Sequence, residues 1–273
     1  MTPSTYLFVP GNRPERFGKA VASGADRVIL DLEDAVAPAD KTLARDAVAT
    51  WLATQDASDQ TKVLVRINDV LSPWHADDLS WLRTQAVGEV MLSKCESAQQ
   101  VASVFDCLKP GGRVLPLIET VRGVLAVQEI AAAAHVSRLA FGSIDYMLDL
   151  DVPGPGFALD AAATAIAMAS RAAELMPPVA GVTPEIDAGR VTTDTAQARA
   201  LGFAAKLCIH PAQVGAVRQA LMPDAATLDW ATKVLAAWQA SGGAGAVQVD
   251  GKMVDKPVVL RAQRVLDAAG PTP

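Results

Sequence analysis

Eight short apolar runs recur between residues 5 and 211, and each has the length of a buried strand. They read TYLFVP (5–10), RVILDLE (27–33), KVLVRI (62–67), EVMLSK (89–94), RVLPLIE (113–119), RLAFG (138–142), PPVAGVT (177–183) and AKLCIHP (205–211). Between the runs, apolar residues return with helical spacing, as at Leu43, Ala47 and Trp51. Near-continuous apolar strands that alternate with amphipathic helices indicate a parallel sheet covered by helices. The pattern therefore predicts an α/β fold.

The number of βα units decides between two architectures of this class. Eight units fit a closed (β/α)8 barrel, the TIM barrel, which commonly occupies about 250 residues as one domain. The competing architecture is a doubly wound open sheet, but the glycine-rich GxGxxG turn that often follows its first strand is missing. We therefore expect a TIM-barrel catalytic domain over residues 1–222.

The remaining residues, 223–273, predict a C-terminal helix and hairpin extension. Helical spacing covers 212–221 and 228–240, and a glycine-rich break, SGGAGA, follows. The run VQVDGKMV (247–254) has the Asp-Gly centre of a tight hairpin, and a last helix is expected from about Pro257. The segment looks too short for a core of its own, so we expect it to pack on the barrel or on a neighbouring subunit.

Composition narrows the possible partners. The net charge of −6 argues against nucleic acid as the main partner, since such proteins usually carry a basic face. No apolar stretch approaches the roughly 20 residues of a membrane span, and no signal-peptide pattern opens the chain. The three cysteines, Cys95, Cys107 and Cys208, form no CxxC pair, which favours a reducing, cytoplasmic setting.

Charged residues gather where the predicted strands end. In TIM barrels the functional groups collect at the C-terminal ends of the strands, so these residues should meet at one mouth. Any single one could begin a surface loop, but six strand ends of this kind indicate a polar pocket of mixed sign. The residues are Asp31, Glu33, Asp34, Arg66, Asn68, Asp69, Lys94, Glu96, Glu119, Asp145 and His210.

Glu119 and Asp145 form the candidate metal pair, because they follow adjacent strands. Carboxylates without a nearby Cys or His set suggest Mg²⁺, with Mn²⁺ as an alternative, and with water and substrate at the remaining positions. The competing interpretation is that each carboxylate is neutralised by a cation such as Arg66 or Lys94.

Three further features suit an anionic substrate. The planar fork of Arg66 fits a carboxylate or an enolate oxygen. The turn of Gly142, Ser143 and Ile144 begins a helix, so its backbone N–H groups could hold a substrate carboxylate. The third feature is the basic stretch at the first helix, which could bind phosphates and consists of Arg13, Arg16 and Lys19. A solvated helix face explains these three residues equally well.

Seven motifs, taken together, resemble the citrate lyase beta-subunit-like branch of the HpcH/HpaI aldolase superfamily. The motifs are YLFVPGNRPERFGKA (6–20), VILDLEDAVAPADK (28–41), VRIN (65–68), LPLIET (115–120), LAFGSIDYMLDL (139–150), GFAAKLCIHPAQV (202–214) and DGKMVDKP (250–257). The resemblance implies a (β/α)8 barrel that assembles as a trimer or hexamer and acts on CoA thioesters of short dicarboxylic acids.

The resemblance also implies roles for particular residues. It places Mg²⁺ on Glu119 and Asp145, and an enolate-stabilising role on Arg66. The basic stretch from Arg13 to Lys19 would contact the phosphates of CoA. The last role falls on Asp255, which would act as proton donor or acceptor in the mouth of a neighbouring protomer.

Glu33 and Asp34 would lie beside the metal, hold its waters, and be compensated by Mg²⁺, Arg66 and Lys94. Many relatives carry aspartate where this chain has Ala180, which we interpret as the loss of a carboxylate from the mouth.

The expected activity is reversible cleavage of a short 3-hydroxyacyl-CoA thioester, such as malyl-CoA or citramalyl-CoA, to acetyl-CoA and a 2-oxo acid. Three alternatives stay open: a thioesterase on the same esters, a class II aldolase on free hydroxy-oxo acids, and a non-catalytic subunit that binds an acyl carrier. The basic stretch favours the CoA esters over the free acids, and the set of Arg66, Glu119 and Asp145 weighs against a non-catalytic subunit.

Overall fold

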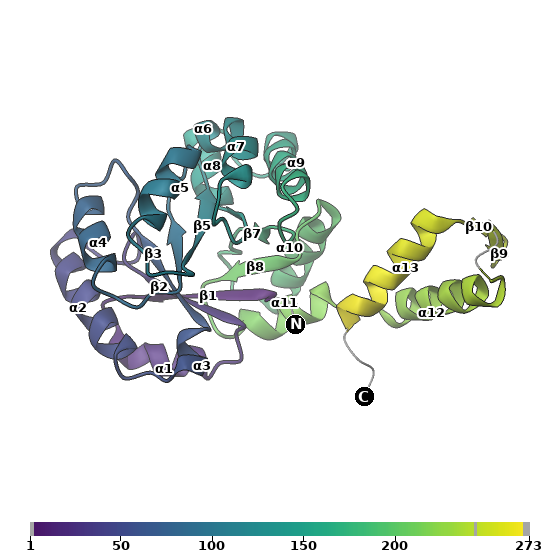
Figure 1. The fold of residues 1–273 in the computed structure, drawn as a ribbon, viewed down its shortest axis with the longest axis horizontal. Coiled ribbons are helices and arrows are strands. Elements are labelled where there is room, and N and C mark those ends of the chain that lie inside the picture. Colours follow the sequence, from purple (N-terminus) through teal and green to yellow (C-terminus); the bar gives the residue numbers. More distant parts are fainter. Residues whose placement is uncertain (1–2, 243–244, 270–273) are drawn as a thin grey trace. The chain divides into compact units, whose positions relative to one another are not determined.

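Eight parallel strands close into a barrel in the order in which they occur along the chain (Figure 1). The computed structural model describes residues 3–242 and 245–269. Each strand pairs with the next, and β1 also pairs with β8. The (β/α)8 barrel predicted from the eight apolar runs is confirmed. The strands are β1 (Thr5–Pro10), β2 (Arg27–Asp31), β3 (Val63–Ile67), β4 (Glu89–Leu92), β5 (Arg113–Ile118), β6 (Ala140–Phe141), β7 (Val179–Ala180) and β8 (Ala205–Cys208).

The strands are apolar on both faces because both faces are buried. Inward-pointing side chains fill the barrel interior, and their neighbours in sequence point outward beneath the helices. On β2, for example, Ile29 belongs to the interior cluster while Val28 and Leu30 are buried on the other face. The interior cluster consists of Tyr6, Ile29, Leu64, Met91, Leu115, Leu117, Ala140, Val179, Ala205 and Leu207.

Helices connect and surround the strands in Figure 1. Several begin at a side chain that accepts a backbone N–H of the first turn: Ser97 from Gln100, Thr120 from Gly123. The elements of the barrel unit are the 3₁₀ helices Pro14–Arg16 and Pro38–Asp40, α1 (Phe17–Val21), α2 (Lys41–Leu52), α3 (Ala57–Gln60), α4 (His75–Leu82), α5 (Ala98–Phe105), α6 (Val121–Leu125), α7 (Val127–Ala132), α8 (Ser143–Asp149), α9 (Phe157–Ala172), α10 (Ala188–Ala200) and α11 (Gln213–Leu221).

The chain divides into two compact units inside α11, one ending at Arg218 and the other beginning at Gln219. The sequence suggests the division after residue 222. Residues 1–2 and 270–273 of the two predicted segments, and 243–244 of the glycine-rich break, lie outside the described residues.

The C-terminal unit holds two helices and a hairpin: α12 (Ala225–Ala240), β9 (Val247–Val249), β10 (Lys252–Val254) and α13 (Lys256–Ala269). The hairpin is antiparallel, and Asp250 and Gly251 at its tip both have positive φ, 49° and 76°. Such a turn favours Asn or Asp followed by Gly, as the motif predicts. The expectation that this segment lacks a core of its own is wrong, because a small apolar cluster forms within it. Its buried members are Ala231, Val234, Val254 and Ala262.

Two features of composition can be checked in this fold. None of the described helices combines the length and the apolar character needed to cross a membrane. The three cysteines are all buried and free, and burial raises the pKa of Cys95 and of Cys208 to about 12. Since the thiolate is the reactive form, neither is suited to act as a nucleophile.

Candidate active site

Arg66 forms the centre of a buried charge cluster at the ends of β2 and β3. Asp31 and Arg66 are register partners on these adjacent strands. The guanidinium grips the carboxylate with two parallel bonds, Nε to Oδ1 at 2.7 Å and a terminal nitrogen to Oδ2 at 2.6 Å. Its other terminal nitrogen lies 2.7 Å from Glu33 Oε2, and the ring of Phe8 lies beneath it. The cluster is a bidentate pair extended by a second carboxylate.

Two neighbouring carboxylates keep the buried Arg66 guanidinium positively charged. Burial by itself lowers the pKa of Arg66, but the negative charges of Asp31 and Glu33 outweigh it and raise the pKa. The guanidinium offers five N–H donors: two form hydrogen bonds to Asp31, and the other terminal nitrogen forms an ion pair with Glu33. At least two of its N–H groups therefore have no acceptor among the described residues and remain for a ligand.

Lys94 completes the compensation of Glu33. Its Nζ donates to Glu33 Oε1 at 2.7 Å, while its backbone N–H donates to Glu119 Oε1 at 2.8 Å. Burial by itself lowers the pKa of Lys94, but the bond and the negative charge of Glu33 outweigh it and raise the pKa. The prediction that Arg66 and Lys94 offset the acidic motif is thus matched by direct contacts to Glu33. Asp34 differs, because it is largely exposed and only its Oδ2 comes within 4.0 Å of Arg66.

Glu119 is buried at the end of β5, and its environment favours a cation beside it. Burial first, and then the charges of Glu33 and Asp145, raise its pKa to about 8, although Arg66 and Lys94 oppose the shift. Its Oε2 accepts no hydrogen bond from the described residues, whereas Oε1 accepts from Lys94. A carboxylate oxygen free beside two other carboxylates is suited to a divalent cation.

The residues present fit Mg²⁺ held by two carboxylates. Among residues 3–242 and 245–269, no group of three or more His, Cys, Asp or Glu side chains is arranged to bind a metal. Mg²⁺ usually keeps several waters and uses one or two protein carboxylates plus the substrate, so the pair of Glu119 and Asp145 is enough. Asp145 lies in the first turn of α8 and is half-buried.

Gly142 allows the turn before α8 to approach Glu119 closely. A Cβ at this position would lie 2.3 Å from Glu119 Oε2, so any side chain here would displace the carboxylate. The Gly142 N–H already donates to the Ile118 carbonyl at 2.9 Å. Of the turn predicted to hold a substrate carboxylate, the N–H groups of Ser143 and Ile144 are therefore the better candidates.

A hydrogen-bond network that the sequence does not predict supports the backbone of the acidic motif. Buried Lys41, at the start of α2, donates to the carbonyls of Leu32 and Glu33 and to Asn68 Oδ1, all at 2.7–2.8 Å. Asn68 in turn donates to Asp78 at 2.6 Å. The Lys41 ammonium thus uses all three of its N–H donors, and two of these hydrogen bonds fix the backbone at Leu32 and Glu33. A lysine seven residues after Asp34 in the sequence gives no sign of this role until the helix folds back.

Comparisons with known proteins now identify the family. The family model described as HpcH/HpaI aldolase/citrate lyase matches residues 4–211. The chain belongs to this family. A citrate lyase subunit beta-like protein of Mycobacterium tuberculosis is 38% identical over 273 residues, covering 97% of this chain and 95% of that protein. A (3S)-malyl-CoA thioesterase of Cereibacter sphaeroides is 30% identical over 270 residues, covering 97% of this chain and 94% of the relative.

A solved structure of the family extends the comparison to three dimensions. The crystal structure of the CitE protein of M. tuberculosis, in complex with magnesium, acetoacetate and coenzyme A, superimposes with a TM-score of 0.88 at 35% identity. The match covers 99% of each chain. The resemblance to citrate lyase beta-subunit-like proteins that the motifs predict is confirmed, and membership of the HpcH/HpaI aldolase/citrate lyase family supports lyase activity in general.

Three predicted residues of the HpcH/HpaI pattern lie on an exposed surface. Arg13, Arg16 and Lys19 are all exposed at the 3₁₀ helix and α1. Glu15 partly neutralises the first two, at 2.7 Å from Arg13 and 3.8 Å from Arg16. Lys19 makes no ion pair within the described part of the chain. The structure does not bring this stretch into the cluster around Arg66.

Asp255 belongs to the C-terminal unit, and Ala180 lies on β7 of the barrel. Asp255 precedes α13, and its Oδ1 accepts the N–H of Val258 at 3.3 Å, as a helix N-cap does. A role in a neighbouring mouth stays a prediction. The interpretation of Ala180 as a position in the mouth is corrected: Val179 belongs to the barrel interior, so Ala180 faces outward.

Proposed function

We propose that this protein is a Mg²⁺-dependent carbon–carbon lyase that cleaves, or forms, a short 3-hydroxydicarboxylyl-CoA thioester such as malyl-CoA or citramalyl-CoA. The observation that carries the proposal is the free oxygen of buried Glu119 beside Asp145, at the end of the barrel that also holds Arg66. Magnesium and CoA in the M. tuberculosis CitE structure support it. The products would be acetyl-CoA and a 2-oxo acid.

Glu119 and Asp145 would hold the cation in this proposal. When bound, Mg²⁺ would polarise the oxygen of the 2-oxo acid portion and offset its negative charge. The N–H groups of Ser143 and Ile144 would orient the substrate carboxylate beside it. Lys94 keeps Glu119 in place through its backbone N–H, so the carboxylate is positioned before any ligand arrives.

Arg66 would stabilise the charge that develops during cleavage. The bond between C2 and C3 of the acyl chain breaks, the 3-hydroxyl loses its proton, and the acetyl thioester leaves as an enolate that takes up a proton. Two free N–H donors of Arg66 can bind the enolate oxygen. A preorganised donor of this kind contributes about 3 kcal/mol to transition-state stabilisation. Asp255 of a neighbouring protomer is our candidate for the proton transfer, which makes a homotrimer or hexamer part of the proposal.

Hydrolysis of the same thioester is the second candidate function. It is favoured by one observation, the 30% identity to the (3S)-malyl-CoA thioesterase of Cereibacter sphaeroides. The two reactions share substrate and site but differ in products, because only hydrolysis releases free CoA thiol.

A screen of malyl-CoA and citramalyl-CoA in the presence of saturating Mg²⁺ tests both functions. Lyase activity predicts glyoxylate or pyruvate in step with acetyl-CoA, without thiol release. Thiol release without a 2-oxo acid would replace the lyase by the thioesterase. Turnover of a free hydroxy-oxo acid instead would point to a class II aldolase. If Mg²⁺ binds through Glu119 but neither ester is turned over, both proposals are contradicted.

A further inference from the structure

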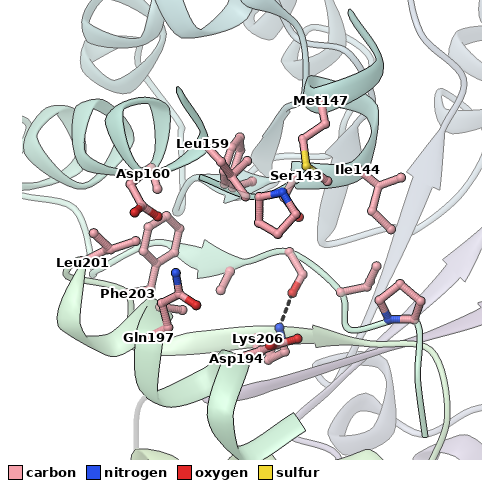
Figure 2. A pocket seen from close by; sticks show the side chains of 18 of the residues that line it. Ser143, Ile144, Met147, Leu159, Asp160, Asp194, Gln197, Leu201, Phe203 and Lys206 are labelled. Carbon is pink, nitrogen blue, oxygen red and sulfur yellow. Dashed lines mark hydrogen bonds between the residues drawn. The ribbon is translucent and has the colours of Figure 1, made fainter. Parts of the chain in front are cut away.

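A cavity of about 260 Å³ lies between the outer face of the barrel and helices α8, α9 and α10 (Figure 2). It is lined from β7 and β8 by Ala180 and Lys206. It shares Ser143 and Ile144 with the proposed lyase site, but Glu119 and Asp145 do not line it. The body of the cavity is therefore unassigned by the proposed function.

Lys206 places a cation in the wall of this cavity. Its neighbours on β8, Ala205 and Leu207, point into the barrel interior, so Lys206 points outward. Its side chain is buried, with the whole residue only 4% exposed, and its Nζ donates one hydrogen bond, to the Gly181 carbonyl at 2.6 Å. Figure 2 shows this bond at the floor of the cavity. Two of the three N–H donors of the ammonium have no acceptor among the described residues.

No carboxylate of the described chain lies within 4.0 Å of the Lys206 ammonium. The strongest opposing charge is that of Asp194, but its two oxygens contact other partners: Thr183 Oγ1 at 2.8 Å and Arg190 Nε at 2.9 Å. Burial consequently lowers the pKa of Lys206, although the charge of Asp194 opposes the shift. Buried charges are normally paired, so a buried ammonium without a carboxylate in contact is unusual and favours an incoming anion.

The residue across the strand from Lys206 explains the lack of a partner. Ala180 on β7 is its register neighbour and lines the same cavity. Side chains of register partners stand on the same face of a sheet. The methyl group of Ala180 neither fills the space opposite Lys206 nor supplies a negative charge there.

Most of the remaining wall is apolar, although Asp160, Asp194 and Gln197 also line the cavity. Figure 2 shows Met147 and Leu159 on one side, and Leu201 and Phe203 on another; the carboxylate of Asp160 lies by Leu201, away from Lys206. A cavity of about 150 Å³ accommodates benzene, so about 260 Å³ suits a ligand of about ten non-hydrogen atoms. Exposed residues at Pro184, Glu185 and Arg190 form a rim through which a ligand can pass.

We propose that this cavity is a second binding site, which takes a small monocarboxylic acid with an apolar tail of about five to nine carbons. The carboxylate pairs with Lys206 in the space opposite Ala180, and the tail lies against Leu159, Leu201 and Phe203. The site is separate from the carboxylates of the lyase site, and its occupation does not depend on the proposed reaction.

Calorimetric titration of the full-length protein with hexanoate and octanoate tests the proposal, in EDTA to keep metal out of the lyase site. Saturable binding with a stoichiometry of one per chain is expected. Hexan-1-ol, which has the same tail without the charge, should bind at least about tenfold more weakly, because a charge-assisted bond is worth about 1.5–3 kcal/mol. Equal binding of the alcohol, or no binding of either acid, would overturn the proposal and leave a solvent-filled cavity.

Two variants locate the binding within the molecule. Lys206→Met removes the cation and keeps the aliphatic stem, and Ala180→Asp supplies an internal carboxylate that competes for the ammonium. Each should weaken hexanoate binding at least about tenfold. Glu119→Gln, which alters the lyase site, and Lys62→Met, which removes an exposed lysine, should bind as the wild type does. Binding that survives both Lys206→Met and Ala180→Asp, or that is lost in Glu119→Gln, would place the acid elsewhere and contradict the proposal.

Discussion

Arg66 on β3 and Lys206 on β8 are buried cations of one barrel with opposite surroundings. Arg66 contacts two carboxylates, and its pKa is raised despite burial. Lys206 contacts one carbonyl oxygen, and burial lowers its pKa. A compensated cation can be part of a rigid, preorganised site, whereas an uncompensated cation favours an incoming anion. Burial of a charge therefore says little about its function until its partners are known.

Removing the partner of Arg66 should have the largest effect on stability. Asp31→Ala leaves the buried guanidinium with Glu33 alone and deprives the N–H groups of Glu33 and Ala35 of their acceptor. Breaking a buried pair costs about 3–5 kcal/mol, so a loss of about 3 kcal/mol in the free energy of unfolding is expected. Urea denaturation followed by circular dichroism measures it.

The matched control is Asp229→Ala, which breaks an exposed pair with Lys233 at 2.7 Å. A change of about 0–1 kcal/mol is expected there. If Asp31→Ala lowers the free energy of unfolding no more than this control does, the ion pair of Arg66 with Asp31 does not stabilise the fold. The comparison between the two cations would then fail.

Changing the two carboxylates of the proposed metal site should strongly lower activity without unfolding the barrel. Glu119→Gln and Asp145→Asn should each lower kcat by about 10²–10³ and weaken Mg²⁺ binding, since each removes a negative charge from the proposed cation site. Thermal melting without metal should be nearly unchanged for Glu119→Gln, because the pKa of about 8 already leaves most of Glu119 uncharged at pH 7. EDTA should remove the activity of the wild type.

Asp151→Asn is the control for these two variants, because Asp151 is exposed just beyond α8. It should retain full activity. A wild type that is indifferent to EDTA, or a Glu119→Gln enzyme of normal turnover, would show that the carboxylates are not a metal site.

The fold could be predicted almost completely because its signal is local. Eight apolar runs gave eight strands, although β6 and β7 shrink to two paired residues each within runs of five and seven. The hairpin followed from one Asp-Gly pair. The C-terminal core was missed because α12 and α13 pair apolar positions about thirty residues apart, as Val234 and Ala262 do. No spacing within one helix reports such a pairing.

The site was predictable only where its residues lie at strand ends. Arg66, Glu33, Lys94 and Glu119 fall there and do meet. Lys206 was not recognised, because it lies within an apolar strand and its importance depends on what the opposite strand supplies. Such a charge can be interpreted only after the register of β7 and β8 is known.

Asp255 extends the comparison to a carboxylate whose only side-chain bond among the described residues caps a helix. Asp255→Asn keeps the cap, since asparagine caps equally well, but cannot transfer a proton. The variant should be inactive. Mixing it with inactive Glu119→Gln protomers, under conditions of subunit exchange, should restore activity at about a quarter of the sites by random pairing in a closed oligomer. Mixed oligomers that stay inactive would rule out a shared site.

The exposed cations at α1 provide a third environment for comparison. Arg16→Ala together with Lys19→Ala should leave stability nearly unchanged, because neither side chain is buried. The KM for a CoA thioester should rise about tenfold, since charge-assisted bonds to phosphate would be lost. The KM for an N-acetylcysteamine thioester, which lacks the nucleotide, should not change. An equal rise for both substrates would assign these residues to the fold rather than to CoA.

The smallest effect is expected at Lys206, and it separates the two cations most clearly. Lys206→Met removes a desolvated charge, which stabilises the fold, and removes one bond to Gly181, which destabilises it. The two contributions are each about 1 kcal/mol and should nearly cancel at pH 7, in contrast to the loss for Asp31→Ala.

The pH dependence of stability shows whether burial of the Lys206 charge is unfavourable. Because the pKa of Lys206 is lower in the folded protein than the ordinary value of 10.5, the unfolded chain binds more protons between those two values. Wild-type stability should therefore rise relative to Lys206→Met as the pH increases from 7 towards 10.5, whereas a compensated lysine would show the reverse. Denaturation midpoints of the two proteins at pH 7, 8.5 and 10 measure this difference, and a gap that stays constant or moves in favour of the variant would mean that Lys206 already has a counter-ion.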